Sequence, residues 1–326
     1  MTPAGGGRAV SKAHLVPGGD FAGTVHSVFA TACNLAVGGR LVTVHDAAAP
    51  HTPTSVRVES SGTGAWAPNA RVGDPVRCQD GVLTFGGHAL DLRRLPVWAP
   101  GHASDPVDAT AIARAADAVA AAHDAHLDGR AFPAPGLDER AAELLAALCE
   151  LAQTKPSPRT TQTSEAARSE RTTHTTSPGH TEETAQAVDV AVRRLIGFGP
   201  GLTPAGDDLL VGLMATLHRL QHRLDGGPAV PMWVGHALRV VGRAVRREAR
   251  RTTDVSAHYL RLAADGEFGE AITRLLDALA AGAPRTTVTA RAQDVLRMGA
   301  SSGADAVAGV LLGVRVLVPS PHQKAA

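Results

Sequence analysis

The 326-residue sequence predicts an α+β protein, with a β-rich N-terminal module (a small barrel or sandwich) followed by a mainly α-helical module. From Gly23 to about Trp98, short segments such as RLVTVH and GVLTFGG are rich in apolar and β-branched residues and are separated by Gly, Pro, Asn and Asp. From Pro106 onward, alanine-rich segments such as RAAELLAALCELA carry apolar residues at three- and four-residue spacing, which is typical of helices. The hydrophobic fraction of 44% is enough for a real core, and 3% aromatic residues leave that core to Ala, Val and Leu.

The chain divides into six expected segments. The run QTKPSPRTTQTSEAARSERTTHTTSPGHTEET has almost no large apolar residue, so it buries too little surface to offset its ordering entropy. We therefore expect it to be a disordered insert whose removal leaves the fold intact. The expected segments are a disordered tail at 1–18, the β-rich module at 19–105, helices joining the helical module at 106–152, the disordered Thr/Ser-rich insert at 153–185, the α-helical module at 186–318 and a tail at 319–326.

Composition excludes several classes of protein. The net charge of +1 argues against a general nucleic-acid binder, which would carry a basic excess. No apolar run is long enough to span a membrane, and the N-terminus has no apolar core of signal-peptide type. The three cysteines, Cys33, Cys78 and Cys149, are widely spaced and predict neither a disulfide framework nor a zinc site. We expect a soluble, cytoplasmic protein.

The stretch GFGPGLTPAGDDLL, from Gly197 to Leu210, joins a glycine-rich loop to the start of a helix. The N-terminus of a helix has unpaired N–H groups and partial positive charge. A glycine-rich approach lets the backbone come close to a ligand there. The loop residues that we expect at such a site are Gly199, Gly201, Thr203 and Gly206, with Asp207 and Asp208 in the first helical turn. The alternative is that the two aspartates only complement the helix dipole.

A second stretch, GASSGADAVAGVLL from Gly299 to Leu312, resembles the first. Without gaps, Asp208 aligns with Asp305 and Gly212 with Gly309. If the two loops face one another, they form a small pocket whose candidate catalytic residues are Asp207, Asp208 and Asp305, with Ser301, Ser302 and Gly303 as ligand-binding residues. Chance similarity in an Ala- and Gly-rich chain is the alternative.

Such a pocket has two chemical interpretations. N–H groups and hydroxyls suit a phosphate or a carboxylate. Asp207 and Asp208 suit a divalent cation such as Mg²⁺, or a donor such as a substrate amide. The GxxxxGK[ST] pattern of a Walker loop is absent, and no βαβ unit surrounds the glycines, so neither nucleotide-binding fingerprint applies.

A third segment, RRTTDVS from Arg250 to Ser256, ends an arginine-rich helix. Arginine is suited to bidentate binding of carboxylate or phosphate. The residues that we expect to meet an anionic substrate are Arg251 (or Arg250), Thr252, Thr253 and Ser256. The alternative is a solvated basic face at a helix C-terminus, where the dipole favours cations.

The motifs GFGPGLTPAGDDLLVG, RRTTDVSAHYL and GASSGADAVAGVLLG, in this order, resemble the AllH-like family, whose namesake is a subunit of oxamate carbamoyltransferase in anaerobic allantoin breakdown. The stretch GTVHSVFATACNLAVGGRLVTVH also resembles the start of that family, so the resemblance runs from about Gly23 to Leu317 without the insert. One departure is Ala300, which stands where the family often has a histidine, and this leaves any role of that imidazole open.

The resemblance implies phosphorolysis of oxalurate to oxamate and carbamoyl phosphate, or the reverse, in an assembly with other carbamoyltransferase subunits. It does not say which subunit carries the chemistry. Two alternatives stay open: a metabolite-binding or regulatory subunit without chemistry of its own, and a stand-alone Mg²⁺-dependent enzyme acting on a small phosphorylated substrate.

Overall fold

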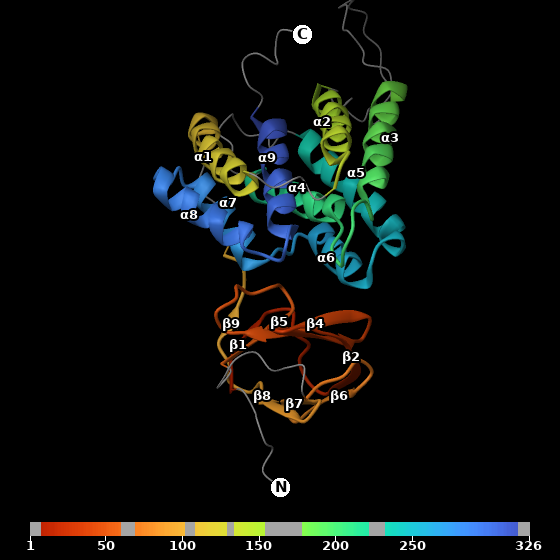
Figure 1. Ribbon diagram of the computed structural model, residues 1–326. Helices are drawn as coiled ribbons and strands as arrows, with labels where there is room; N and C mark the ends of the chain where they lie inside the picture. The colour runs from red at the N-terminus through yellow and green to blue at the C-terminus, as the bar shows by residue number, and fades with distance from the viewer. Residues whose placement is uncertain are drawn as a thin grey trace, which may run out of the picture. The chain divides into compact units, whose positions relative to one another are not determined.

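The computed structural model describes residues 8–59, 69–101, 108–128, 134–153, 178–221 and 232–318, which form two compact units. The first unit comprises residues 1–103 and 267–275, and the second comprises residues 104–266 and 276–326. Strands fill the first unit and helices the second, so the predicted α+β class is confirmed (Figure 1). In the described part of the chain, no helix is long and apolar enough to cross a membrane.

The first unit is built on one nine-stranded sheet with the order β8-β7-β6-β2-β3-β4-β5-β1-β9. The sheet curls over on itself, so that β1 contacts β8, and it is closer to an open barrel than to a sandwich (Figure 1). Its strands are β1 (Arg8–Ala13), β2 (Phe21–Val28), β3 (Ala32–Val37), β4 (Arg40–Asp46), β5 (Ser55–Glu59), β6 (Pro75–Gln79), β7 (Val82–Phe85), β8 (His88–Asp91) and β9 (Val97–Trp98).

Three hairpins of this sheet have two-residue turns, at Gly38-Gly39, Asp80-Gly81 and Gly86-Gly87. Every one of these turn residues has a positive φ, between 49° and 78°. Such turns match the right-handed twist of the strands, which explains why the glycine pairs interrupt the apolar segments. The inner face of the curled sheet buries small aliphatic side chains, such as Leu35, Val44 and Val56.

The expectation of a disordered tail through residue 18 is wrong from Arg8 onward. Residues 8–13 form β1, which pairs antiparallel with β5 and parallel with β9. Ala9 and Ala13 are buried in the core of the sheet, and so is Val16 just beyond the strand. These small side chains give β1 a buried face. The glycine-rich residues before it made this segment look like part of a disordered tail.

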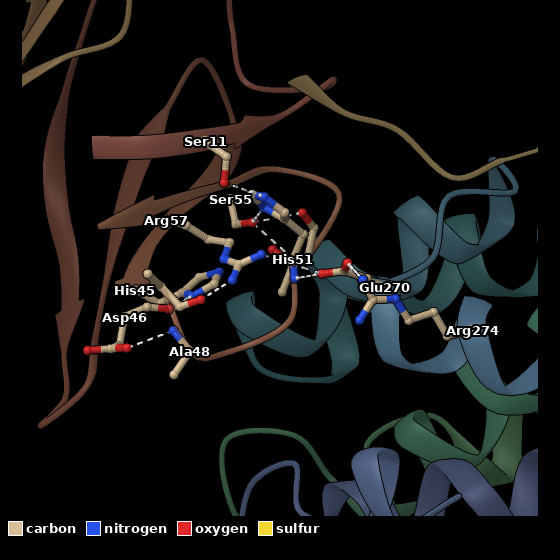
Figure 2. A network of polar contacts seen from close by, with 11 residues as sticks. Ser11, His45, Asp46, Ala48, His51, Ser55, Arg57, Glu270 and Arg274 are labelled. Carbon is tan, nitrogen blue, oxygen red and sulfur yellow. Dashed lines mark hydrogen bonds and ion pairs between the residues drawn. The ribbon is translucent and has the colours of Figure 1, made fainter. Parts of the chain in front are cut away.

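His51 ties β1 to the loop before β5 (Figure 2). Its ring is buried, with Nδ1 2.7 Å from Ser55 Oγ and Nε2 2.9 Å from Ser11 Oγ. It also stacks on Trp98, with ring centroids 5.5 Å apart. Burial, and then the charge of Arg57, lowers the pKa of His51 to about 3, so the imidazole is neutral.

Residues 267–275 belong to the sheet unit, although we expected 186–318 to form a single helical module. Glu270 and His51 exchange two hydrogen bonds of 2.8 Å: the Glu270 N–H donates to the His51 carbonyl, and Glu270 Oε2 accepts from the His51 N–H. Arg274 and Arg57 lie 2.5 and 4.0 Å from the same carboxylate (Figure 2). This long-range pairing is what places the start of helix α7 in the first unit.

Helix α4 is at the centre of the helical unit and contacts α3, α5, α6 and α9. Residues on almost every side of α4 are buried, as expected for a helix surrounded by others. The helices of the chain are α1 (Ala109–Leu127), α2 (Leu137–Gln153), α3 (Pro178–Leu195), α4 (Ala205–Leu220), α5 (Met232–Glu248), the short 3₁₀ helix η1 (Ala249–Arg251), α6 (Asp254–Ala264), α7 (Glu270–Ala280), α8 (Arg285–Leu296) and α9 (Ser302–Leu317).

Helices α4 and α9 approach each other at two glycines. A Cβ added at Gly212 would overlap the Ala306 carbonyl oxygen, and a Cβ added at Gly309 would overlap that of Leu209. Farther along both helices, the Thr216 hydroxyl lies 3.4 Å from the Val310 carbonyl oxygen. The two helices therefore run in the same direction and bring their N-termini to the same end of the pair.

The expected insert at 153–185 falls mostly outside the described residues, at 154–177. The expectation is wrong for residues 178–185, which open α3. Thr184 and Ala185 are buried there, at 2% and 8% exposed, so this end of the Thr-rich run joins the helical unit. The expected tail at 319–326 also lies outside the described residues.

We predict that Gly309→Ala destabilises the protein by about 2 kcal/mol or more, because α9 must move away from the Leu209 carbonyl. Gly235→Ala on α5 is the matched control, since the nearest atom to its added Cβ is the terminal nitrogen of Arg239 at 3.4 Å. This control should gain up to about 1 kcal/mol from the higher helix propensity of alanine. Urea unfolding of both variants measures the difference, and equal stability would contradict the close approach of α4 and α9.

Candidate functional site

Asp207 anchors the glycine-rich loop that precedes α4. It is buried at 1% exposed, and its Oδ1 accepts the Gly197 N–H at 2.9 Å. Its Oδ2 accepts the hydroxyls of Thr252 and Ser256, the latter at 2.7 Å. Burial raises the pKa of Asp207, and these three donors act in the opposite direction. Both oxygens therefore serve to hold the loop against the start of α6.

The segment RRTTDVS is a second part of this anchor. Thr253 is the N-cap of α6, where its hydroxyl accepts the Ser256 N–H at 3.1 Å and donates to the Leu202 carbonyl. Gly197 has a φ of +75°, and a Cβ there would lie 2.8 Å from the Arg251 carbonyl oxygen. The start of α6 thus holds the glycine-rich loop through hydrogen bonds from the predicted residues Thr252, Thr253 and Ser256.

The structure brings the two glycine-rich loops together. Thr203 Oγ1 lies 2.6 Å from Ser302 Oγ, at the N-termini of α4 and α9. The loops are also built alike, because the Gly206 N–H donates to the Phe198 carbonyl and the Gly303 N–H to the Met298 carbonyl, both at 2.9 Å. These two N–H groups close the loops, so they are not aimed at a ligand.

The same likeness extends to the helices before the loops. A Cβ at Gly206 would overlap the carbonyl oxygen of Leu195 at the end of α3, and one at Gly303 would overlap that of Val295 near the end of α8. Gly199 and Gly299 both have positive φ, 110° and 62°. The pair α3–α4 and the pair α8–α9 are therefore built alike as helix–loop–helix units, which extends the loop-to-helix similarity expected from the sequence to the preceding helices.

Asp208 and Asp305 lie at this meeting point with carboxylate oxygens that lack partners. Asp305 is 0% exposed, and in the described part of the chain neither of its oxygens has a hydrogen-bond partner of good geometry. Asp208 Oδ2 is buried and unpartnered in the same way. Burying a carboxylate without a hydrogen-bond partner is unfavourable in free energy. Binding a donor or a proton at each of these oxygens would remove this penalty.

Burial shifts both carboxyl groups toward their protonated forms. Burial raises the pKa of Asp305 to about 6, and the Ser301 hydroxyl acts against this rise. Burial also raises the pKa of Asp208 well above its usual value, the hydroxyls of Ser302 and Thr203 oppose the rise, and the charges of Asp305 and Asp207 add to it. The charge of Asp305 thus acts on Asp208, so the two acids lie within electrostatic range of each other.

Two other predicted residues take different positions. Arg251 does not join the carboxyl pair; among the described residues it contacts Glu248 at 3.5 Å and the Arg193 carbonyl at 3.4 Å. Gly201, with a φ of +95°, has open space where a side chain would begin. A contact that the sequence did not indicate comes from His123 on α1, whose Nε2 lies 3.1 Å from the Ala304 carbonyl oxygen beside Asp305.

Few carboxylate oxygens are free to coordinate the expected Mg²⁺ at the described start of α4. Both oxygens of Asp207 are already engaged with the loop anchor. Within the described ranges, no three or more His, Cys, Asp and Glu side chains are grouped as a metal site requires. At the meeting of the two loops, the described carboxylates with oxygens that lack partners are Asp208 and Asp305, and two carboxylates are too few for an all-protein cation cage.

We predict that Asp207→Ala lowers the free energy of unfolding by about 3 kcal/mol, because it leaves one buried N–H and two hydroxyls without their acceptor. Asp265→Ala is the control: this acid is 57% exposed and pairs with Arg246 at the surface, so its loss should cost less than about 1 kcal/mol. Chemical denaturation measures both changes. Similar losses in the two variants would show that Asp207 is not the loop anchor.

We predict that Asp305→Asn raises the free energy of unfolding by an amount that depends on pH. Folded Asp305 holds its proton up to about pH 6, whereas the unfolded chain releases it near about pH 4. The folded state therefore binds more protons in this window, and the contribution of Asp305 to stability falls as the pH rises from about 4 to about 6. The free energy of unfolding of the variant should be higher than that of the wild type by on the order of 2 kcal/mol at about pH 7.5, and equal to it near about pH 4. Denaturation across this range tests the prediction, which a pH-independent difference would refute.

Two family models match the chain. The model described as oxamate carbamoyltransferase subunit AllH matches residues 195–314, which include both glycine-rich loops and the RRTTDVS segment. The model of the AllH family N-terminal domain matches residues 8–97, which form the curled sheet. No solved structure matches. The resemblance carried by the three motifs is thus confirmed over most of the sequence, and the chain belongs to the AllH family of oxamate carbamoyltransferase subunits.

Proposed function

We propose that this chain binds the carbamoyl substrate of an oxamate-type carbamoyltransferase at the paired N-termini of α4 and α9, in an assembly with other subunits. The family description supports the role as a subunit. The observation that carries the site is the pair Asp208 and Asp305: Asp208 Oδ2 and both Asp305 oxygens lack a hydrogen-bond partner among the described residues, close to where Thr203 meets Ser302. A substrate that brings N–H groups would satisfy these oxygens.

Carbamoyl compounds match the chemistry of these groups. The substrate oxalurate carries amide N–H groups, which are donors for carboxylate oxygens, and carbonyl oxygens, which are acceptors for hydroxyls. The hydroxyls at the meeting of the loops, Thr203, Ser301 and Ser302, would complement the carbonyl oxygens. Fixed donors at the carbamoyl oxygen would also stabilise the charge that grows there in the transition state.

The raised pKa of Asp305 suits proton transfer. In phosphorolysis, a phosphate oxygen forms a bond to the carbamoyl carbon, the C–N bond to oxamate breaks, and the leaving nitrogen takes a proton. A carboxyl group with a pKa of about 6 is protonated in part near neutral pH and able to give that proton. We assign this role to Asp305 and the binding of the substrate amide to Asp208.

The assembly itself provides the test. In the complex of this chain with the other carbamoyltransferase subunits, we predict that Asp305→Asn and Asp208→Asn each lower kcat for carbamoyl phosphate formation from oxalurate and phosphate by about 100-fold or more. The control is Asp294→Asn on α8, an acid that pairs with Arg291 and Arg297 at the surface, and it should keep the wild-type rate. Steady-state assays and circular dichroism measure rate and folding.

The outcome also separates the competing interpretations. Folded Asp208→Asn and Asp305→Asn variants with wild-type kcat would remove the catalytic assignment. If such variants lose only the binding of oxalurate or carbamoyl phosphate while the other subunits keep full activity, the chain is a metabolite-binding subunit.

A further inference from the structure

A cavity of about 410 Å³ lies beside the loop anchor, away from the contacts of Asp208 and Asp305. Four arginines from three segments line it: Arg140 at the start of α2, Arg193 and Arg194 at the end of α3, and Arg251 in η1. Its other lining residues are Val190, Ile196, Gly197 and Phe198. This volume is within the range of small-molecule sites, roughly 300–1,000 Å³.

The arginines around this cavity outnumber the carboxylates that pair with them. Glu248 is shared by Arg193, Arg247 and Arg251, at 3.2, 3.0 and 3.5 Å. The further ion pairs are Arg194–Glu143 and Arg247–Asp189, at 2.7 and 2.8 Å. Three carboxylates thus pair with these four arginines, of which Arg247 does not line the cavity.

Arg140 is the fifth arginine of this group, and it makes no ion pair with a carboxylate of the described residues. Its guanidinium carbon lies 4.1 Å above the centre of the Phe198 ring, and its NH1 donates to the Arg194 carbonyl at 2.9 Å. The four arginines that line the cavity have two carboxylate partners among the described residues, Glu143 and Glu248, which leaves an excess of two positive charges in this set. A ligand with two negative charges would balance it.

The walls of the cavity are held in place while the arginine ends stay accessible. Gly197 donates its N–H to Asp207 and approaches the Arg251 backbone too closely for a side chain, which fixes the floor against η1. Arg193, Arg194 and Arg251 are about half exposed, at 48%, 56% and 54%. Guanidinium groups in such an arrangement match the oxygen pairs of carboxylate and phosphate.

We propose that the Arg140–Arg193–Arg194–Arg251 cavity is a binding site for a small dianionic oxyanion, a dicarboxylate or a phosphate, separate from the carboxyl pair at α4 and α9. This goes beyond the proposed carbamoyl site, because it requires neither carbamoyl transfer nor another subunit. A bound dianion replaces the solvent around four guanidinium groups and ties α2, α3 and η1 together.

Calorimetric titration of the full chain with inorganic phosphate and, in a second arm, with malonate tests the proposal at about 0.1 M salt, where surface charges are already screened. We predict that at least one of the two anions binds. Arg140→Gln should raise the Kd of that anion by about tenfold or more. Arg251→Lys should also weaken binding, since lysine keeps the charge but loses the bidentate fork.

The controls distinguish this site from general charge and from the carbamoyl site. Arg246→Gln removes an arginine that is 52% exposed, pairs with Asp265 and does not line the cavity, so it should leave Kd unchanged. The result is independent of the proposed function, because neither Asp208 nor Asp305 lines this cavity. The proposal is overturned if neither anion binds at about 10 mM, a concentration that would saturate a millimolar site, or if Arg246→Gln weakens binding as much as Arg140→Gln. Binding of phosphate alone or of malonate alone supports the site and identifies the oxyanion.

Discussion

The carbonyl oxygens of Ala306 and Leu209 occupy the space where side chains would begin at Gly212 and Gly309. No other residue fits at either glycine without moving a helix, so this contact sets the distance and the direction of α4 and α9. The direction matters most for function, because parallel helices place two positive dipole ends together. Most features of the candidate site, including the approach of Thr203 to Ser302, follow from that single constraint.

Adjacent aspartates at the start of α4 have different environments because successive helical residues point about 100° apart. Asp207 turns toward α6 and receives three donors, which makes it a structural residue. Asp208 feels the Ser302 hydroxyl and the charge of Asp305, both on α9, and its Oδ2 has no hydrogen-bond partner among the described residues. The fold thus satisfies one carboxylate completely and leaves its neighbour's oxygen without a partner, a contrast expected where stability has been given up for binding.

The sequence predicted the parts of the structure that depend on local pattern. Strand alternation, Gly- and Asp-containing turns and helical periodicity predicted the α+β class, and the spacing of glycine and aspartate predicted two similar loop-to-helix elements. Contacts between distant residues were not predictable in this way: the strand Arg8–Ala13 is stabilised by β5, and Glu270 is tied to His51. For the same reason the sequence suggested ligand-binding roles for Thr252 and Ser256, whose hydroxyls instead hold Asp207.

The two copies of the helix–loop–helix unit belong to one polypeptide, and this has an evolutionary consequence. A site made by two identical subunits repeats every substitution on both sides, whereas here each half changes alone. The first loop spans residues 196–204 and the second only residues 297–301. The two similar units therefore differ in the length of the loop that each contributes, so the two sides of the proposed site are not equivalent.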